Sequence, residues 1–119
     1  MSVGSALAEA NFVVFGNNND DTGTTSSSLS GISKRSKREW NFDEKGTVTA
    51  DIKIDISDAT GHSGSISAAS NYKLLFKTCE FCNFLELETG DSVSGDVITF
   101  SNVTIQDGIF CIASADSNL

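Results

Sequence analysis

The sequence contains no proline, one histidine, one tryptophan and three cysteines among its 119 residues. An odd number of cysteines excludes a complete disulfide framework within the chain. No apolar run approaches the roughly 20 residues that a membrane-spanning helix needs, so we expect no insertion into a membrane. Basic residues are also scarce: 8 Lys and Arg against 16 Asp and Glu give a formal charge of -8. This balance argues against nucleic acid as the principal partner.

Length and composition predict one small domain spanning residues 1–119. With 39% apolar residues, a chain of this length can bury roughly two-thirds of its unfolded surface in a single core. Residues 1–10 lack the basic start and the apolar stretch of a secretory signal, and we interpret them as an N-terminal extension. Residues 16–33 consist mainly of Asn, Asp, Ser, Thr and Gly, which predicts a long polar loop whose composition favours mobility.

Apolar and polar residues alternate regularly from Thr47 to Ile56, as expected of a strand with one buried face. Six shorter β-rich runs are bounded by turn-forming residues: Asn11–Phe15, Arg38–Phe42, Tyr72–Lys77, Phe84–Glu88, Val97–Phe100 and Ile109–Ala113. Seven strands at this spacing, without a convincing 3.6-residue apolar period, predict an all-β fold, an antiparallel immunoglobulin-like β-sandwich. We expect the side chains of Trp40, Val48, Ile52 and Ile54 to lie in its core.

Cys79 and Cys82 are separated by two residues, so both sulfurs can turn toward one point. This spacing suits a local disulfide, reduced structural thiols, half of a zinc site or a redox pair. Structural zinc needs four ligands, and only Cys111, His62 and carboxylates remain to complete a set. A redox pair normally has its reactive thiolate at a helix N-terminus, which the β-rich pattern does not offer. We therefore favour a structural role, with a local disulfide and reduced thiols both open, and expect Cys111 to be a buried free thiol.

Four of the eight basic residues fall within five positions: Lys34, Arg35, Lys37 and Arg38. In one interpretation this cluster meets an acidic surface of another copy or an anionic polymer, which makes it a candidate interaction patch. In the other, which we prefer, it is a solvated start of a strand that offsets nearby acids.

Candidates for catalysis and metal binding are weak. His62 lies in a turn-like segment, where an exposed loop residue is favoured over a catalytic base. Neither a Gly-x-Ser-x-Gly elbow nor a Gly-rich phosphate-binding pattern is present. Asp and Asn cluster within 17–21, 55–58 and 90–92, but the full calcium-loop pattern is missing, which favours solvated turns. The sequence predicts no catalytic residue, no metal ligand and no cofactor.

Short motifs follow one another along the chain at Phe12–Asn18, Lys37–Phe42, Gly46–Ile52, Asn71–Phe76, Val97–Val103 and Asp107–Phe110. Their order, over roughly residues 11–115, resembles a β-sandwich domain of poorly characterised function found in large secreted or surface-exposed bacterial multidomain proteins. The resemblance implies an extracellular structural or adhesive module and transfers no catalytic residues. Where that family often has an Asp-rich turn, this chain has Lys77–Phe84 with two cysteines. The difference disfavours a calcium site there and suggests that the two-cysteine loop fixes the turn.

These features predict a non-enzymatic module of the cell surface or the extracellular space that contributes to surface architecture or adhesion. Its expected partners are other protein copies, in a homo-oligomer, or neighbouring domains of a surface assembly. A first alternative is a subunit of an extracellular filament, in which the N-terminal segment or an edge strand completes a neighbour by strand addition. A second alternative is a carbohydrate-binding module that uses Trp40 or Tyr72. A small enzyme ranks last.

Overall fold

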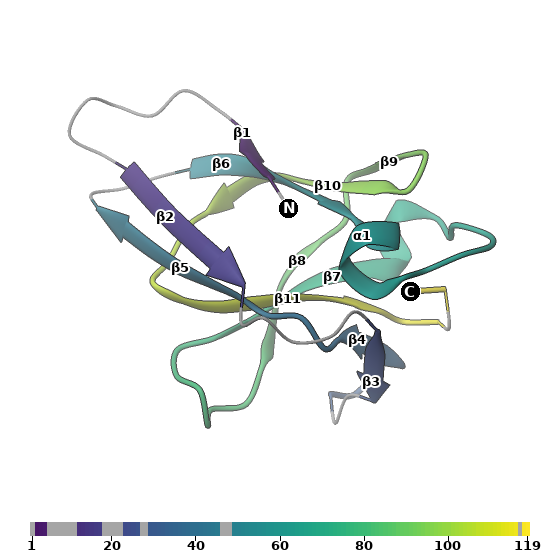
Figure 1. Cartoon of the computed structure of the whole chain (residues 1–119), viewed down its shortest axis with the longest axis horizontal. Helices are drawn as coiled ribbons and strands as arrows, with labels where there is room; N and C mark the ends of the chain where they lie inside the picture. The colour runs from purple at the N-terminus through teal and green to yellow at the C-terminus, as the bar shows by residue number, and fades with distance from the viewer. Residues whose placement is uncertain (1, 5–11, 18–22, 27–28, 46–48, 117) are drawn as a thin grey trace.

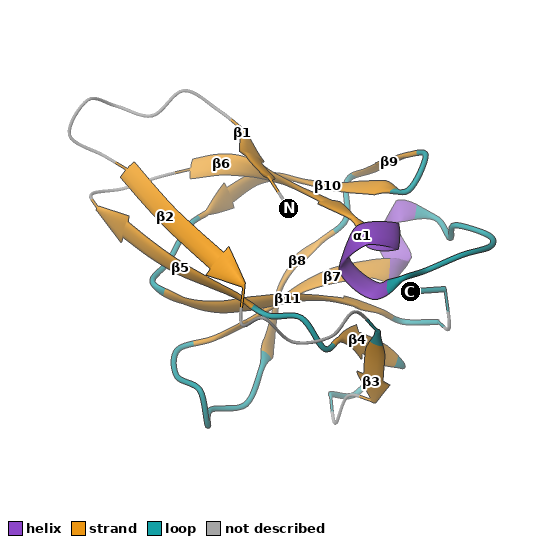
Figure 2. Ribbon diagram, in the orientation of Figure 1, coloured by secondary structure: helices purple, strands orange, loops and turns teal. Residues whose placement is uncertain are grey.

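The computed structural model describes residues 2–4, 12–17, 23–26, 29–45, 49–116 and 118–119, whose strands pair into two antiparallel sheets. Sheet A has the order β1-β6-β10-β9 and contains β1 (Ser2–Gly4), β6 (Thr49–Asp55), β9 (Ser92–Ser94) and β10 (Val97–Thr104). Sheet B contains β2 (Phe12–Asn17), β3 (Thr24–Ser26), β4 (Lys34–Ser36), β5 (Trp40–Lys45), β7 (Tyr72–Lys77), β8 (Leu85–Thr89) and β11 (Gly108–Ser114). Sheet A lies above sheet B in Figures 1 and 2, with helix α1 (Ile56–Thr60) at one end.

The predicted all-β antiparallel sandwich is confirmed, and each of the seven predicted strands has a counterpart in it. The middle of sheet B is β11, which pairs with β7 on one side and with both β4 and β5 on the other. Beyond these, β8 pairs with β7, while β3 and β2 pair with β4 and β5 respectively. Strands that are far apart in sequence therefore meet at the centre of the molecule.

The main core lies between the two sheets, because alternate residues of the central strands point inward. The inward side chains of the longer strands are those of Trp40, Phe42, Ala50, Ile52, Ile54, Tyr72, Leu74, Phe76, Ile98, Phe100, Phe110 and Ile112. The Phe110 ring lies 4.6 Å from the ring centroid of Phe42 and 4.9 Å from that of Phe76. Burial of Trp40, Ile52 and Ile54 confirms their predicted place in the core, and Val48 lies outside the described residues.

Several short elements were not predicted from the sequence. Ser2–Gly4, part of the predicted N-terminal extension, forms β1 and pairs with β6 of its own chain. The predicted polar loop 16–33 contains β3, and its first two residues belong to β2. Leu29 and Ile32, in the same predicted loop, pack against the outer side of sheet B. Strands of three residues contain too few alternations to be recognised by their periodicity.

Helix α1 follows β6 directly, where the sequence predicted only a solvated turn. Asp55 caps its N-terminus by accepting hydrogen bonds from the backbone N–H groups of Ser57 (3.0 Å) and Asp58 (3.3 Å). Gly61 ends the helix at a φ of 74°, a left-handed conformation that favours glycine. The Ser57 hydroxyl also donates to the Asp55 carboxylate, which keeps the pKa of this aspartate below its ordinary value.

The C-terminal residues are held against the segment that precedes β7. The buried Tyr72 hydroxyl accepts a hydrogen bond from the Ser67 backbone N–H (3.1 Å) and donates one to the Asn118 carbonyl (2.7 Å). Asp116 accepts hydrogen bonds from the side chains of Ser67 and Asn71. Tyr72 is therefore a structural residue whose polar group is satisfied inside the fold. Among the described helices, none is long and apolar enough to cross a membrane.

We expect Ile52→Ala to lower the free energy of unfolding by about 2–5 kcal/mol, because it removes a fully buried side chain from β6 and leaves a cavity. Lys53→Ala is the matched control, since the neighbouring side chain is exposed on the same strand and should change stability by less than about 0.5 kcal/mol. Urea denaturation of both variants measures the difference. Equal midpoints would contradict the placement of Ile52 in the core.

Asp55→Ala should destabilise the protein by about 0.5–2 kcal/mol at neutral pH through loss of the helix cap. Because the pKa of Asp55 is lowered in the folded state, its contribution is complete above about pH 4 and is lost as the pH falls through the lower, folded-state pKa. The stability difference between wild type and variant should therefore shrink below about pH 4. Denaturation midpoints from pH 7 to pH 2 test this, with the exposed Asp43→Ala as a control; a difference independent of pH would refute it.

Candidate functional site

The outer face of sheet B, on the side away from sheet A, has an apolar centre on the strands β7 and β11. Leu75 of β7 and Cys111 and Ala113 of β11 are fully buried there. They are covered by Phe84, which precedes β8, and by the loop that carries Leu29 and Ile32. Sheet B is consequently buried on both faces at its centre, and a second, smaller core forms outside the sandwich.

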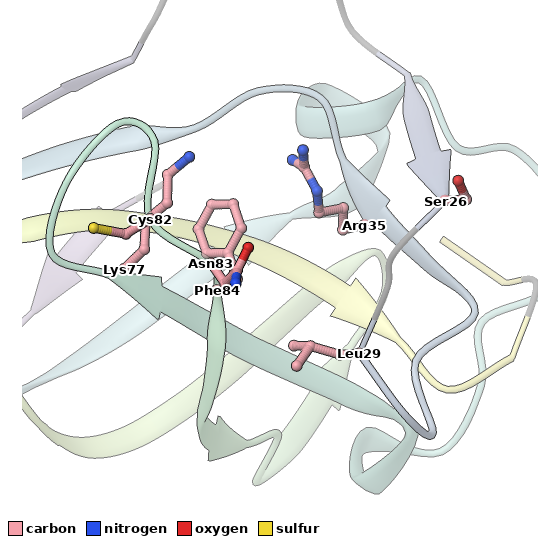
Figure 3. A pocket seen from close by; sticks show the side chains of 7 residues that line it. All are labelled: Ser26, Leu29, Arg35, Lys77, Cys82, Asn83 and Phe84. Atoms are coloured by element: carbon pink, nitrogen blue, oxygen red, sulfur yellow. The ribbon is translucent and has the colours of Figure 1, made fainter.

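The Phe84 ring lies between two cationic side chains (Figure 3). The Lys77 ammonium is 4.5 Å from the ring centroid and the Arg35 guanidinium carbon is 5.1 Å from it. Both distances suit attraction between a cation and the negative face of an aromatic ring, worth about 0.5–1 kcal/mol each at exposed sites and more where the cation is desolvated. Phe84 thus joins the apolar cover of sheet B to a charged cluster.

Glu39 is the carboxylate that both cations share. Its Oε2 is 3.4 Å from Nη1 of Arg35 and its Oε1 is 3.5 Å from Nζ of Lys77. The side chains of all three residues are mostly buried, and that of Lys77 is only 8% exposed. Partial burial strengthens these ion pairs relative to solvent-exposed ones. The cluster of two cations and one carboxylate carries an excess positive charge in a chain whose net charge is -8.

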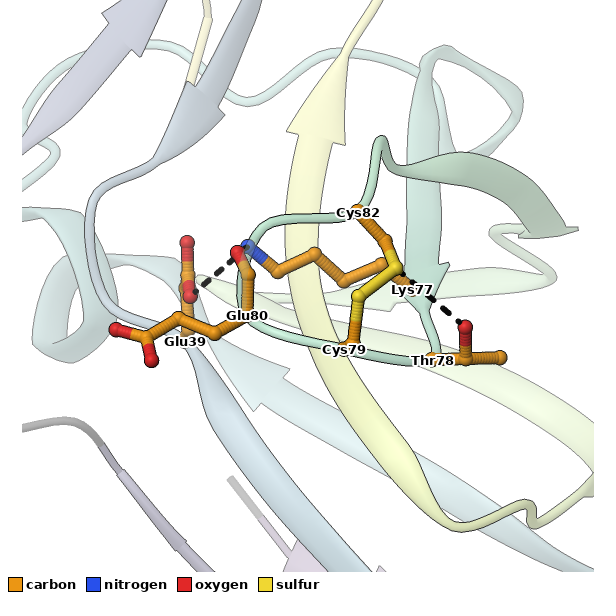
Figure 4. The surroundings of a disulfide bond; sticks show 6 residues. All are labelled: Glu39, Lys77, Thr78, Cys79, Glu80 and Cys82. Carbon is orange, nitrogen blue, oxygen red and sulfur yellow. Dashed lines mark hydrogen bonds and ion pairs between the residues drawn. A yellow bond between two sulfur atoms is a disulfide. The ribbon is translucent and has the colours of Figure 1, made fainter.

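The structure joins Cys79 to Cys82 in a disulfide with a Cα–Cα distance of 5.1 Å (Figure 4). We call residues Cys79–Cys82 the cystine loop. The backbone N–H of Cys82 donates to the Cys79 carbonyl (3.1 Å), and Lys77 Nζ donates to the Glu80 carbonyl (2.9 Å). The cystine loop is therefore tied both to itself and to the charged cluster. At its tip, the Phe81 side chain is 93% exposed.

A pocket of about 390 Å³ opens at the outer face of sheet B, beside the side chains that cover it. Its lining residues are Ser26, Leu29, Arg35, Lys77, Cys82, Asn83 and Phe84. We call it the outer-face pocket. It combines two cations with an aromatic ring, an aliphatic side chain, a hydroxyl and an amide, so it suits an acidic group attached to an apolar body.

The four residues of the predicted basic patch have different environments. Arg35 turns toward Phe84 and lines the outer-face pocket, where its carboxylate partner is Glu39 of the same chain. Lys37 is exposed, and Lys34 is half-buried. Arg38 is also half-buried, and its Nε is buried without a hydrogen-bond partner among the described residues. Of the patch, Arg35 alone is placed in this pocket.

Cys111 is free and buried, as predicted. Burial removes the thiolate from water and raises the pKa of Cys111 to about 12. The thiol therefore stays protonated at neutral pH and acts as a small apolar side chain beneath Phe84.

The other side chains that the sequence singled out have structural partners. Nε2 of His62 is 2.9 Å from the Ser65 carbonyl, and Asp91 accepts a hydrogen bond from the Ser101 backbone N–H (2.7 Å). Trp40 and Tyr72 are buried in the main core and offer no face to a sugar. Within the described ranges, no group of three His, Cys, Asp or Glu side chains could hold a metal ion.

No sequence motif identifies Glu39, Lys77 or Phe84 as site residues. The sequence does, however, indicate that the sheet surface beneath them is apolar. The run Leu74-Leu75-Phe76 and the run from Ile109 to Ala113 are apolar without alternation. Such runs are typical of strands that are buried on both faces. The second apolar face of such a strand must be shielded from water, so neighbouring segments have to place apolar or long amphipathic side chains on it.

A family model described as "Domain of unknown function (DUF8202)" matches residues 2–109 of the chain. The chain belongs to this family. The DUF8202 match begins at β1 and ends within β11, so it contains the cystine loop and every residue that lines the outer-face pocket. No curated protein and no solved structure shows a match to the chain.

Phe84→Ala should lower the free energy of unfolding by about 3–5 kcal/mol, because it removes the ring that covers the outer face of sheet B. It should also increase the rate at which a thiol reagent modifies Cys111. Leu85→Ala is the control, since it truncates an exposed apolar side chain directly after Phe84 and should leave both quantities nearly unchanged. Equal effects of the two substitutions would contradict the covering role of Phe84.

Proposed function

We propose that this domain is a non-enzymatic structural or adhesive module of an extracellular or cell-surface assembly, and that it acts by binding other protein surfaces. The observation that carries the proposal is the exposure of Phe81 at the tip of the cystine loop. Phe81 is 93% exposed. Burying a Phe side chain is worth about 1.5–3 kcal/mol. A protein partner that covers this side chain would gain this contribution.

The disulfide supports contact through a preformed surface. Closing the ring between Cys79 and Cys82 limits the conformations of the two residues between them, Glu80 and Phe81. Their backbone therefore loses less freedom when a partner binds. Exposed aromatic side chains held in this way are typical anchors of protein interfaces.

The same disulfide supports an extracellular setting. Disulfides persist in oxidising surroundings and are rare where glutathione keeps thiols reduced. Cys79 is exposed and Cys82 is half-buried, so reductants have access to this bond. The resemblance to domains of secreted and surface-exposed bacterial proteins points in the same direction.

Strand addition is a second candidate mode, because among the described residues β8 pairs with β7 alone and has an open edge. Two features oppose pairing at this edge. Consecutive residues Leu74 and Leu75 pair with Glu88 and Glu86, so Leu87 is an extra residue in a β-bulge. The two glutamates add charge to the strand. Bulges and charges are devices that keep edge strands from pairing, and we therefore favour docking through side chains.

The proposal is tested in the organism that makes the chain. Antibodies against the domain should label intact, unpermeabilised cells, and a domain found only inside cells would refute the extracellular setting. In the full-length protein, Phe81→Asp should reduce retention in the surface fraction by about tenfold, as expected for loss of an aromatic anchor. Gln106→Asp places the same charge at an exposed position between β10 and β11 and should leave retention unchanged. Unchanged retention of Phe81→Asp would contradict the proposal.

A further inference from the structure

We propose that the outer-face pocket receives the cystine loop of a second copy of this chain, and that two copies exchange their loops in a two-fold symmetric dimer. This inference rests on the proposed function, because it specifies the partner of the exposed loop. The loop supplies Glu80 and Phe81, and the pocket supplies Arg35, Lys77 and Phe84.

Charge complementarity identifies a second copy as the occupant. Glu80 is exposed at the tip of the loop. The pocket contains two cations that share the Glu39 carboxylate, so it can accept a further acidic group. The net charge of -8 makes copies repel one another over most orientations. Contact between the acidic loop and the basic pocket selects the orientation in which opposite charges meet.

Shape and polarity point to the same contact. Phe81 is the most exposed large apolar side chain among the described residues. The pocket offers it the Phe84 ring and the Leu29 side chain, and its volume of about 390 Å³ falls in the range of about 300–1,000 Å³ that is typical of binding pockets. An aromatic ring placed there would contact another ring, an arrangement that adds to simple burial.

The position of the loop relative to the pocket allows both contacts to form at once. Cys82 belongs to the loop and lines the pocket, and Asn83 follows it in the lining. The loop between β7 and β8 and the β3–β4 end of sheet B both lie on the side of the molecule away from sheet A (Figure 1). Because the cystine loop and the outer-face pocket are adjacent on one face, each loop can enter the other copy's pocket across a two-fold axis. This arrangement gives a closed dimer.

The first experiment is sedimentation equilibrium of the full 119-residue chain under non-reducing conditions. Wild type should dimerise, and Phe81→Ala and Glu80→Lys should each raise the dimer Kd at least tenfold, because each change is present twice in the interface. Leu85→Ala, an exposed apolar position outside loop and pocket, should change Kd less than threefold. A Leu85→Ala effect as large as that of Phe81→Ala would place the contact on β8 and overturn the inference.

The second experiment mixes a loop variant with a pocket variant. Phe81→Ala retains an intact pocket and Arg35→Gln retains an intact loop, so their heterodimer keeps one complete contact whereas each homodimer keeps none. The heterodimer should therefore bind at least tenfold more tightly than either variant binds itself. Slow modification of Cys111 in Arg35→Gln shows that the outer face is still covered. Heterodimer affinity no tighter than the homodimers would overturn loop exchange.

Monomeric wild type at roughly 1 mM would also overturn the inference. That result would not decide the proposed function. If Phe81→Asp still released the full-length protein from the cell surface, the loop would bind a different protein. If it did not, both proposals would fail.

Discussion

The pairing of β7 with β11 is the constraint on which the rest of the structure depends. Six consecutive residue pairs join the two strands, from Ile109 opposite Lys77 to Ser114 opposite Tyr72. Their inner faces close the main core, and the centre of their outer faces is also apolar and buried, at Leu75, Cys111 and Ala113. A ladder buried on both sides needs a cover on both sides. Sheet A supplies one cover, and loops from two distant parts of the chain supply the other.

The composition of the second cover determines the character of the candidate site. Loops have no continuous apolar face to offer, so Phe84 is combined with the long side chains of Arg35 and Lys77, whose aliphatic parts can lie on apolar surface while their charges remain near water. Glu39 then offsets part of the charge. The outer-face pocket lies beside this cover and is lined by Phe84, both cations and Leu29. The candidate site and the second core therefore share side chains, Phe84 and Leu29.

Strand positions could be predicted because alternation and turn residues are local signals, as the agreement between Thr47–Ile56 and β6 illustrates. The place of Ile52 in the core follows from the same signal. The charged cluster could not be predicted this way, since Glu39, Lys77 and Phe84 are brought together by the partners of β11, and pairing partners are not encoded by periodicity. Helix α1 could not be predicted for a different reason. Its five residues are too few to show a helical period, although Asp55 and Gly61 mark both of its ends.

The position of Cys111 beneath Phe84 affects how the protein survives heating. In the folded state the thiol is buried and burial raises its pKa to about 12, so it does not attack the disulfide. Once the chain unfolds without reductant, its pKa returns to about 8.5 and thiolate forms in mildly alkaline solution. Exchange then links Cys111 to either loop cysteine and replaces the pairing of Cys79 with Cys82 that the folded state contains. The fraction of protein that refolds after cooling should consequently fall with the time spent unfolded and with rising pH. Resistance to heat is then set by the rate of disulfide exchange and not by the equilibrium free energy of unfolding.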